Sequence, residues 1–421
     1  MRARRLASVL WLAGAIALAA GCGGRPNEET GFTPSPSGDR VASHTGLTLD
    51  FKLSLGGFAI QRTTRVILRR PDGRILRRVP VYETRKGFAS AGSAADMAWS
   101  PDGSLLGVRS PDELLVVDAR SGRKRSLARD VAAFRWVSPS DIVFATGTEF
   151  SRSCAVCRLS LPDGAVERLF SDAQPHTFHP LTSRYHNPLS PDGARFVYFT
   201  TNEVRIVDVP KGRVAHRVAA VLYPSFCWWT DDSRRCLIHG LAEEATGKAF
   251  PENTAFADTF LLFDRQAGGI TNMTANLRAL NGERYNPPRP QVPGRVWSPD
   301  GSWFVATGAS ADRTARRDWI CAVEPWRVLC VQEAAGAAFS DPVVANRGNR
   351  LALFVKNHDF DASGQLYVAD VSCAGADAIS LSAPRRIAAA PLTQWFWSAD
   401  GTDVIVFDGG RFRPHPTGDQ P

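Results

Sequence analysis

The sequence lacks the features that would place it in several common classes of protein. Apolar residues do not recur with the 3.6-residue period of a helix over any useful length, which excludes a mainly helical fold. No run reaches the roughly 20 apolar residues that a membrane-spanning helix needs. The motifs G-x-S-x-G, H-E-x-x-H, the P-loop and the dinucleotide fingerprint are all missing, so the chain carries no signature of a serine hydrolase, a zinc peptidase or a nucleotide-binding domain.

The first residues have the layout of a secretory signal. Three arginines precede the uncharged run Leu6–Gly21, and Cys22 follows it, so we expect a signal peptide at residues 1–21. Leu18–Cys22 resembles a bacterial lipobox, which implies that Cys22 is lipidated and anchors the chain in a membrane, facing the periplasm. Gly23 in place of an aspartate favours the outer membrane over the inner one. The alternative is a plain cleaved signal and a free periplasmic protein.

The next segment is poor in apolar residues. Gly23–Ser43 consists mainly of Gly, Pro, Ser, Asn and Thr and cannot bury enough surface to offset the entropy of ordering. We therefore expect a flexible tether at residues 22–46. The formal net charge is +8, but three of these charges belong to the signal, so an exported chain of this charge implies no nucleic-acid partner.

A short motif recurs along the rest of the chain. It reads W-S-P-D-G at Trp99–Gly103 and again at Trp297–Gly301. Five weaker copies start at Trp136, Leu189, Trp229, Val344 and Trp397. Most of the distances between these seven anchors lie near the ~40 to 50 residues of one propeller blade.

One repeat divides into four short strands. In the repeat from Ala94, Pro101 presets φ for a turn, Asp102 bonds its own backbone and Gly103 takes a left-handed φ. The motif is therefore a hairpin turn. We expect Trp99, just before it, to be a core residue between neighbouring blades.

These residues resemble the TolB-type, WD-like β-propeller repeat, in which S-P-D-G precedes an apolar strand and a second strand ends in Asp before a turn, as in Leu114–Gly122. The resemblance implies an all-β, seven-bladed β-propeller of four-stranded antiparallel blades over residues 47–412, followed by a disordered tail at 413–421. The last repeat stops after two strands. Thr64–Val81 would supply the other two, so the seventh blade would be closed by N- and C-terminal strands, which removes exposed edges.

Cysteine spacing predicts two disulfides in an oxidising compartment. Counting outward from tight turns sets Cys321 opposite Cys330 and Cys227 opposite Cys236, within disulfide range. Cys154 and Cys157 would lie on opposite faces of one strand. The pairing of Cys154, Cys157 and Cys373 stays open, with a redox C-x-x-C site as an alternative for the first two.

The longest insertions fall mostly on the face opposite the S-P-D-G turns, which is where repeat folds place binding surfaces. His176, His179 and His186 share one of these loops, but their spacing matches no zinc pattern. Asp359, Asp361 and Asp370 partly follow a calcium-loop pattern, with Asp where a bidentate Glu is usual. We therefore expect no cofactor. The alternative is that the histidines bind a metal ion or that the aspartates bind calcium.

Arginines on the same face form a candidate binding surface. Their guanidinium groups suit an acidic partner, and a solvated polar surface is the alternative. The residues are Arg278, Arg284, Arg313, Arg316 and Arg317.

Together these observations predict a binding protein of the bacterial envelope. Peptidases that carry such a propeller have a separate hydrolase domain, for which the sequence leaves no region. We expect a monomeric lipoprotein whose propeller binds an envelope protein or a cell-wall-associated partner without catalysis. The alternative is a metal-dependent propeller enzyme, similar to polysaccharide lyases, acting on an acidic sugar polymer.

Overall fold

The chain was analysed as a computed structural model. It describes residues 29–418 with breaks at 46–47, 55–56, 85–95, 111–112, 148–152, 174–175, 178–186, 201–202, 220–222, 244–255, 274–275, 277–284, 287–294, 310–315, 337, 357–362, 374–378 and 392–394. No helix within this part of the chain is long and apolar enough to cross a bilayer. The signal peptide and Cys22 lie outside the described residues.

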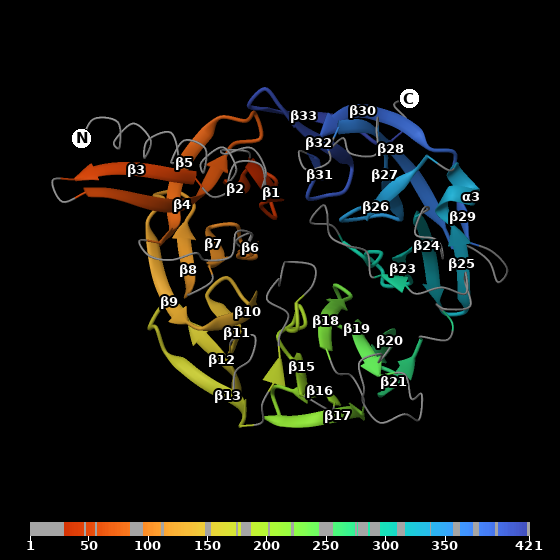
Figure 1. Ribbon diagram of the computed structural model, residues 1–421, viewed down its shortest axis with the longest axis horizontal. Helices are drawn as coiled ribbons and strands as arrows, with labels where there is room; N and C mark the ends of the chain where they lie inside the picture. The colour runs from red at the N-terminus through yellow and green to blue at the C-terminus, as the bar shows by residue number, and fades with distance from the viewer. Residues whose placement is uncertain are drawn as a thin grey trace, which may run out of the picture.

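The described part of the chain forms eight antiparallel sheets around a central axis, as the blades of a propeller (Figure 1). Each sheet is built from consecutive residues. The first blade comprises β1 (Glu29–Pro34), β2 (Val41–Thr45), β4 (Gly57–Arg69) and β5 (Ile75–Thr84), and β3 (Thr48–Ser54) pairs with the first half of β4.

The next four blades have four strands each, in chain order from the axis outward. The second comprises β6 (Asp96–Trp99), β7 (Leu105–Arg109), β8 (Glu113–Asp118) and β9 (Lys124–Arg129). The third comprises β10 (Val131–Trp136), β11 (Asp141–Thr146), β12 (Cys154–Ser160) and β13 (Val166–Asp172). The fourth comprises β14 (His176–Thr177), β15 (Arg195–Thr200), β16 (Glu203–Asp208) and β17 (Arg213–Ala219). The fifth comprises β18 (Tyr223–Trp229), β19 (Arg235–Glu243), β20 (Phe256–Asp264) and β21 (Gly269–Asn272).

Three blades complete the ring. The sixth comprises β22 (Tyr285–Asn286), β23 (Trp303–Ala309), β24 (Arg316–Val323) and β25 (Trp326–Cys330), followed by the helix α3 (Val331–Ala335). The seventh comprises β26 (Ser340–Val344), β27 (Arg350–Lys356), β28 (Ser363–Ser372) and β30 (Arg385–Pro391), with β29 (Ser380–Leu381) also paired to β28. The eighth has three strands, β31 (Trp395–Trp397), β32 (Asp403–Asp408) and β33 (Arg411–Pro416).

The expected seven blades are therefore wrong, and the blade that sequence reasoning missed is the first. β1 and β2 lie in the segment expected to be a tether, and β4 and β5 complete their own sheet instead of closing the last one. Pro34–Gly38 reads P-S-P-S-G and forms the turn that S-P-D-G forms elsewhere. The amide of Gly38 donates to the Ser35 carbonyl at 2.9 Å, as the amide of Gly103 donates to Ser100.

The expected tail at 413–421 is also shorter, because β33 runs to Pro416. The eighth blade thus keeps β33 as its outermost strand. Pro414 and Pro416 have no backbone N–H, and Arg411 and Arg413 are exposed beside them. Proline and charge on an edge strand oppose pairing with another chain.

The repeated turn is held by one set of bonds. In the second blade, Ser100 Oγ donates to Asp102 at 2.6 Å, and Gly103 has a φ of 69°. The hydrogen bond from Ser100 lowers the pKa of Asp102. The same serine-to-aspartate bond recurs at Ser190, Ser298 and Ser398. The interpretation of the motif as a hairpin turn is thus confirmed.

One apolar cluster fills each interface between neighbouring blades, and the eighth cluster closes the ring. In that closing cluster the Phe32 ring of β1 lies 5.6, 5.0 and 5.7 Å from the rings of Phe396, Phe407 and Phe412 in the last blade. The Arg69 guanidinium lies 5.0 Å from the centre of the Phe407 ring. The first and last blades therefore meet through side chains and do not share a sheet.

The cysteine register differs from the counted one by two residues. Val323 pairs with Trp326 across the turn, so Cys321 lies opposite Val328, and Cys330 lies opposite Trp319. Diagonal neighbours of this kind have Cα atoms about 7–8 Å apart, beyond the range that a disulfide accepts.

The second predicted pair is also diagonal, because a four-residue turn replaces the two-residue one, but here the two thiols interact with each other. Cys227 lies opposite Ile238, and Trp229 lies opposite Cys236. All seven cysteines in the described part are free thiols. Cys154 and Cys157 belong to the cores of different blade interfaces, so their placement on opposite faces of β12 is confirmed.

Candidate functional site at the propeller axis

A pocket of about 410 Å³ lies on the axis at the face that carries the S-P-D-G turns. Every blade contributes to its wall, with residues at or next to its repeated turn. Five indole rings form much of the lining, from Trp99, Trp136, Trp228, Trp229 and Trp297. Sequence reasoning missed this pocket, because it placed function on the opposite face.

Hydrogen bonds from the indoles fix the inner wall. Nε1 of Trp297 donates to the Trp228 carbonyl at 2.9 Å, and Nε1 of Trp136 donates to the Ala98 carbonyl at 2.9 Å. Trp99 donates in the same way to Thr33 of the first blade at 2.9 Å. Trp99 is also buried in the core between the first two blades, which confirms its expected role. The tryptophans thus position neighbouring blades and line the pocket together.

Arg295 joins three blades at the pocket wall. Its guanidinium forms an ion pair with Asp231 of the fifth blade and donates to the Asn346 carbonyl of the seventh at 3.3 Å. The amide of Asn346 in turn donates to the Ser398 carbonyl of the eighth blade at 2.9 Å. A polar chain therefore runs along the rim from the fifth blade to the eighth.

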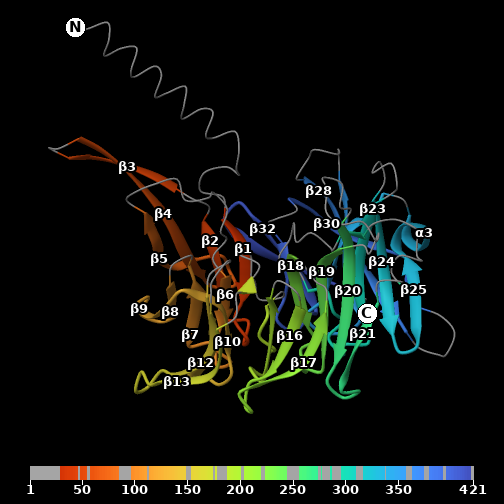
Figure 2. The same ribbon diagram turned by 60° about the horizontal axis from the view of Figure 1, so that its bottom comes forward.

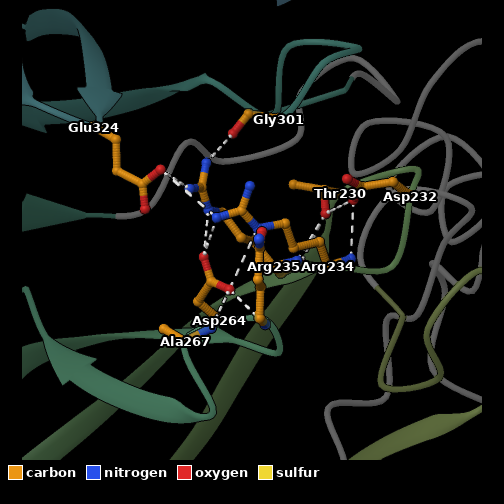
Figure 3. Close-up of polar contacts among 9 residues, drawn as sticks. Thr230, Asp232, Arg234, Arg235, Asp264, Ala267, Gly301 and Glu324 are labelled. Carbon is orange, nitrogen blue, oxygen red and sulfur yellow. Dashed lines mark hydrogen bonds and ion pairs between the residues drawn. The ribbon is translucent and has the colours of Figure 1, made fainter.

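The turn that presents Asp231 is braced by ion pairs of the buried Arg235 with Asp264 and with the exposed Glu324 (Figure 3). Arg235 is 5 % exposed; its guanidinium lies 2.9 Å from Asp264 and 2.5 Å from Glu324, and donates to the Gly301 carbonyl at 2.9 Å. Burial would raise the pKa of Asp264, but hydrogen bonds led by that from Arg235 lower it to about 2. These contacts lock the fifth blade to the sixth beside the pocket.

Two further arginines line the pocket. Nε of Arg135 donates to the Leu189 carbonyl at 3.2 Å, so this side chain spans the third and fourth blades. Arg347 lies on the exposed turn of the seventh blade. The lining thus has three guanidinium groups and one carboxylate, Asp231, which is already paired with Arg295. Cationic groups therefore outnumber carboxylates among the described lining residues.

A buried carboxylate lies in the innermost strand of the second blade. Asp96 is 5 % exposed, and none of the described residues donates a hydrogen bond to its Oδ2. Burial raises the pKa of Asp96 to about 6, while the charges of Arg109 and Arg135 oppose the rise. The interior of the ring is thus sensitive to protonation near neutral pH.

Most of the predicted metal ligands lie outside the part of the chain that the structure describes. His176 lies in β14, but its side chain is outside the description, as are His179, His186, Asp359 and Asp361. Gly364 and Asp370 are both residues of β28, and Asp370 lies 3.2 Å from Arg350, so the second half of the predicted calcium loop is a strand, and calcium binding stays a prediction. No group of three potential metal ligands occurs among the described residues.

The predicted arginine surface is only partly visible. Arg317 is exposed and lies 3.8 Å from Glu333 of α3. Arg316 begins β24, and its side chain is not described. Arg278, Arg284 and Arg313 lie outside the described residues, so their contribution to a binding face stays a prediction.

Comparisons with known proteins find similarity to solved structures only. No protein-family model matches the sequence, and no curated protein sequence does. Among solved structures, the tricorn protease is 11 % identical with a TM-score of 0.45, and the match covers 93 % of this chain and 42 % of that one. The C-terminal WD40 domain of Sif2 is 11 % identical with a TM-score of 0.44, and the match covers 93 % of this chain and 97 % of that domain.

The β-propeller domain of the Trilobed protease from Pyrococcus furiosus is 10 % identical with a TM-score of 0.39. The match covers 94 % of this chain and 95 % of that domain. This chain thus spans less than half of the tricorn protease. At such low identities and TM-scores, the likenesses say nothing of the activity of this chain.

Proposed function

We propose that this protein is a binding scaffold of the bacterial envelope, and that the axial pocket receives an acidic segment of a partner protein. The observation that carries the proposal is the pocket itself, to which all eight blades contribute. Its volume is in the range of pockets that hold small ligands and peptide ends.

The chemistry of the wall favours a carboxylate-bearing segment. Arg347 is exposed at the rim, and the only carboxylate among the described lining residues, Asp231, is already paired with Arg295. Guanidinium groups bind carboxylates through two parallel hydrogen bonds. The indole edges offer apolar contact area, and aromatic and arginine side chains are enriched among the residues that dominate binding at protein interfaces.

The N-terminal sequence supports the envelope as the location. Its basic start, apolar run and lipobox-like string before Cys22 fit a lipoprotein. In this proposal a lipid on Cys22 anchors the chain, in the outer membrane rather than the inner one, and the partner is an envelope or cell-wall-associated protein. No catalytic step is included.

Site-specific photo-crosslinking in cells tests the proposal. A photoreactive residue replaces Pro36, which is exposed and lines the pocket, and the control position is Arg120, on an exposed turn that does not line it. We expect an adduct with an envelope protein at Pro36 and none at Arg120. Equal adducts at both positions, or none at either, would contradict the proposal.

The charge of the pocket is tested in the same assay. Arg347→Glu places a negative charge against the partner's carboxylates and should reduce the Pro36 adduct by about tenfold or more. Arg347→Lys keeps the charge and should retain most of the adduct. If both variants behave alike, the acidic segment is excluded, although binding in the pocket is not.

A further inference from the structure

Basic side chains gather on the outside of the first two blades. β5 is the outermost strand of the first blade and β9 that of the second, and both views place the two strands on the same side of the ring (Figures 1 and 2). We call the exposed cationic residues of these strands and their turns the basic flank. They are Arg74, Arg77, Arg78, Arg120, Arg123 and Lys124.

Contacts within the basic flank join the two blades. Nε of Arg77 donates to the Ser121 carbonyl at 3.3 Å, and Nζ of Lys124 donates to the Pro80 carbonyl at 2.8 Å. The Arg77 side chain also packs on Gly122, where a Cβ would lie 3.1 Å from Cδ of the arginine. The charges of the two blades therefore form one continuous surface.

The cations of the flank have no counter-ions in the described part of the chain. None of the six forms an ion pair with a described residue. Most described basic residues of the third to sixth blades are paired, as Lys211 is with Asp208. Two carboxylates, Asp72 and Asp118, lie in the turns beside the flank, where they accept hydrogen bonds from turn amides. The flank thus carries a net positive charge.

Protection of a strand edge does not explain this density of charge. Charge on an outermost strand opposes pairing with another chain, but β21, the outermost strand of the fifth blade, reads G-I-T-N and carries none. Guanidinium groups bind phosphate oxygens through two parallel hydrogen bonds. A surface of unpaired guanidinium groups therefore favours a ligand with several phosphates.

The chain before the first blade brings a membrane within reach of the flank. Cys22, which carries a lipid in the proposed function, precedes Glu29 by only seven residues. Seven residues span at most about 25 Å. The sheet order is β1-β2-β4-β5, which sets β5 about 15 Å from β1 at the usual strand spacing. A bilayer that holds Cys22 can therefore contact the flank.

We infer that the basic flank binds the anionic headgroups of the membrane in which the chain is anchored. The inference rests on the envelope location of the proposed function, but not on the axial pocket. Attraction to anionic lipid grows with each Lys or Arg near the surface and is screened by salt. Contact along the flank lays the propeller axis along the bilayer, so the axial pocket opens beside the membrane and stays accessible to a partner.

Flotation with vesicles tests the inference without the lipid anchor. The full chain with Cys22→Ser is mixed at low salt with vesicles of phosphatidylcholine, with or without the anionic phosphatidylglycerol. We expect more binding to the anionic vesicles, and added salt should remove the difference. Arg120→Gln/Arg123→Gln in this chain should lower binding to the anionic vesicles by about thirtyfold, because two charges leave the flank.

The matched control is Lys211→Gln/Arg213→Gln, in the equivalent turn of the fourth blade. In both turns an aspartate is followed four residues later by a glycine with positive φ, Gly122 or Gly212. Both variants lower the net charge equally, so a difference between them reports where the charges lie. We expect the control to bind as its parent does. Equal losses in the two variants, or no preference for anionic vesicles, would overturn the inference.

A second readout measures which side of the propeller meets the bilayer. A dye is attached to Ser121→Cys or to Lys211→Cys, which hold the same position in their turns, in a chain that also carries Cys22→Ser and Cys373→Ser. Anionic vesicles whose headgroups carry a quencher should dim the dye at position 121 and leave position 211 bright. Equal quenching at both positions, or none, would contradict the inference.

The flank and the pocket can fail separately, because the vesicle assays contain no partner protein. A chain that prefers anionic vesicles through the flank but gives no adduct at Pro36 keeps this inference and rejects the proposed function. A chain that gives the Pro36 adduct but binds both kinds of vesicle equally does the reverse.

Discussion

The indole nitrogen of Trp297 in the sixth blade lies 2.9 Å from the Trp228 carbonyl oxygen in the fifth. Trp229, at the same place in the repeat of the fifth blade, has an indole nitrogen that is buried and bonds to no described residue. Trp297 and Trp229 therefore occupy equivalent positions between neighbouring blades, but only Trp297 makes this hydrogen bond.

Replacing each of these two tryptophans with phenylalanine separates the bond from the packing. Both Trp297→Phe and Trp229→Phe remove indole volume, but only Trp297→Phe leaves the Trp228 carbonyl without its donor. We expect Trp297→Phe to lose roughly 1–3 kcal/mol more of the free energy of unfolding, measured by urea denaturation. Equal losses would mean that packing alone holds the interface.

Gly73 tests how the ring closes. A Cβ at this position would lie 2.6 Å from the Gly410 carbonyl oxygen of the last blade, while a Cβ at Gly268 would meet nothing within 4 Å. Both glycines have positive φ, so the alanine variants share the backbone strain. We expect Gly73→Ala to cost about 1–3 kcal/mol more than Gly268→Ala, from the overpacked contact. Matching melting temperatures for the two variants would show that the first and last blades do not press together here.

Arg235 and Arg350 follow equivalent turns in different surroundings. Arg235 is 5 % exposed between Asp264 and Glu324, whereas Arg350 is 30 % exposed and its partner Asp370 is 70 % exposed. Breaking the buried set by Arg235→Ala should cost about 3 kcal/mol, and Arg350→Ala less than about 1 kcal/mol. Thermal unfolding of both variants provides the comparison, and a larger loss for Arg350→Ala would contradict it.

Asp96 and His44 give opposite pH dependences. Burial lowers the pKa of His44 from 6.5 to about 4, so the unfolded chain takes up this proton first and stability falls as pH drops from 6.5 to 4. The pKa of Asp96 is raised to about 6, so its contribution to stability is present below pH 3.8 and is lost as pH rises through 6. The two effects oppose each other over the same window.

Asp96→Asn removes the contribution of Asp96 to the pH dependence of stability and leaves that of His44. Between pH 7 and pH 4 the wild type should gain about 3 kcal/mol of unfolding free energy relative to the variant. Urea unfolding at several pH values measures this difference. A difference that does not change with pH would show that Asp96 has an ordinary pKa in the fold.

The sequence predicts the kind of fold well and the number of blades poorly. W-S-P-D-G sets its own geometry, because serine, aspartate and glycine each make a bond or a φ that defines the turn. The first copy, Pro34–Gly38, was hidden because Ser37 takes the place of aspartate and Asp39 follows two residues later. Ser35 Oγ still donates to Asp39 at 2.9 Å, so the turn forms with altered spacing.

The site was harder to predict than the fold. The tryptophans of the repeat signal core packing, and nothing in one repeat shows that their edges meet around an axis. The predicted cross-strand register was wrong for a similar reason, because two more residues in the turn move Cys236 from a position opposite Cys227 to a diagonal one. Loop length is a local property that residue spacing alone does not fix.

The meeting of β1 and β33 through the Phe32 cluster has a consequence for chain connectivity. Since each sheet is one unbroken piece of sequence, the ring has no privileged starting blade. The two ends meet at a single junction but on opposite faces, because β33 ends beside the turn at Thr402 and β1 begins at the far face, so a linker that joins them would have to run the length of a strand. New ends could then be opened between any other pair of blades with all eight sheets intact, which makes this a natural scaffold for circular permutation.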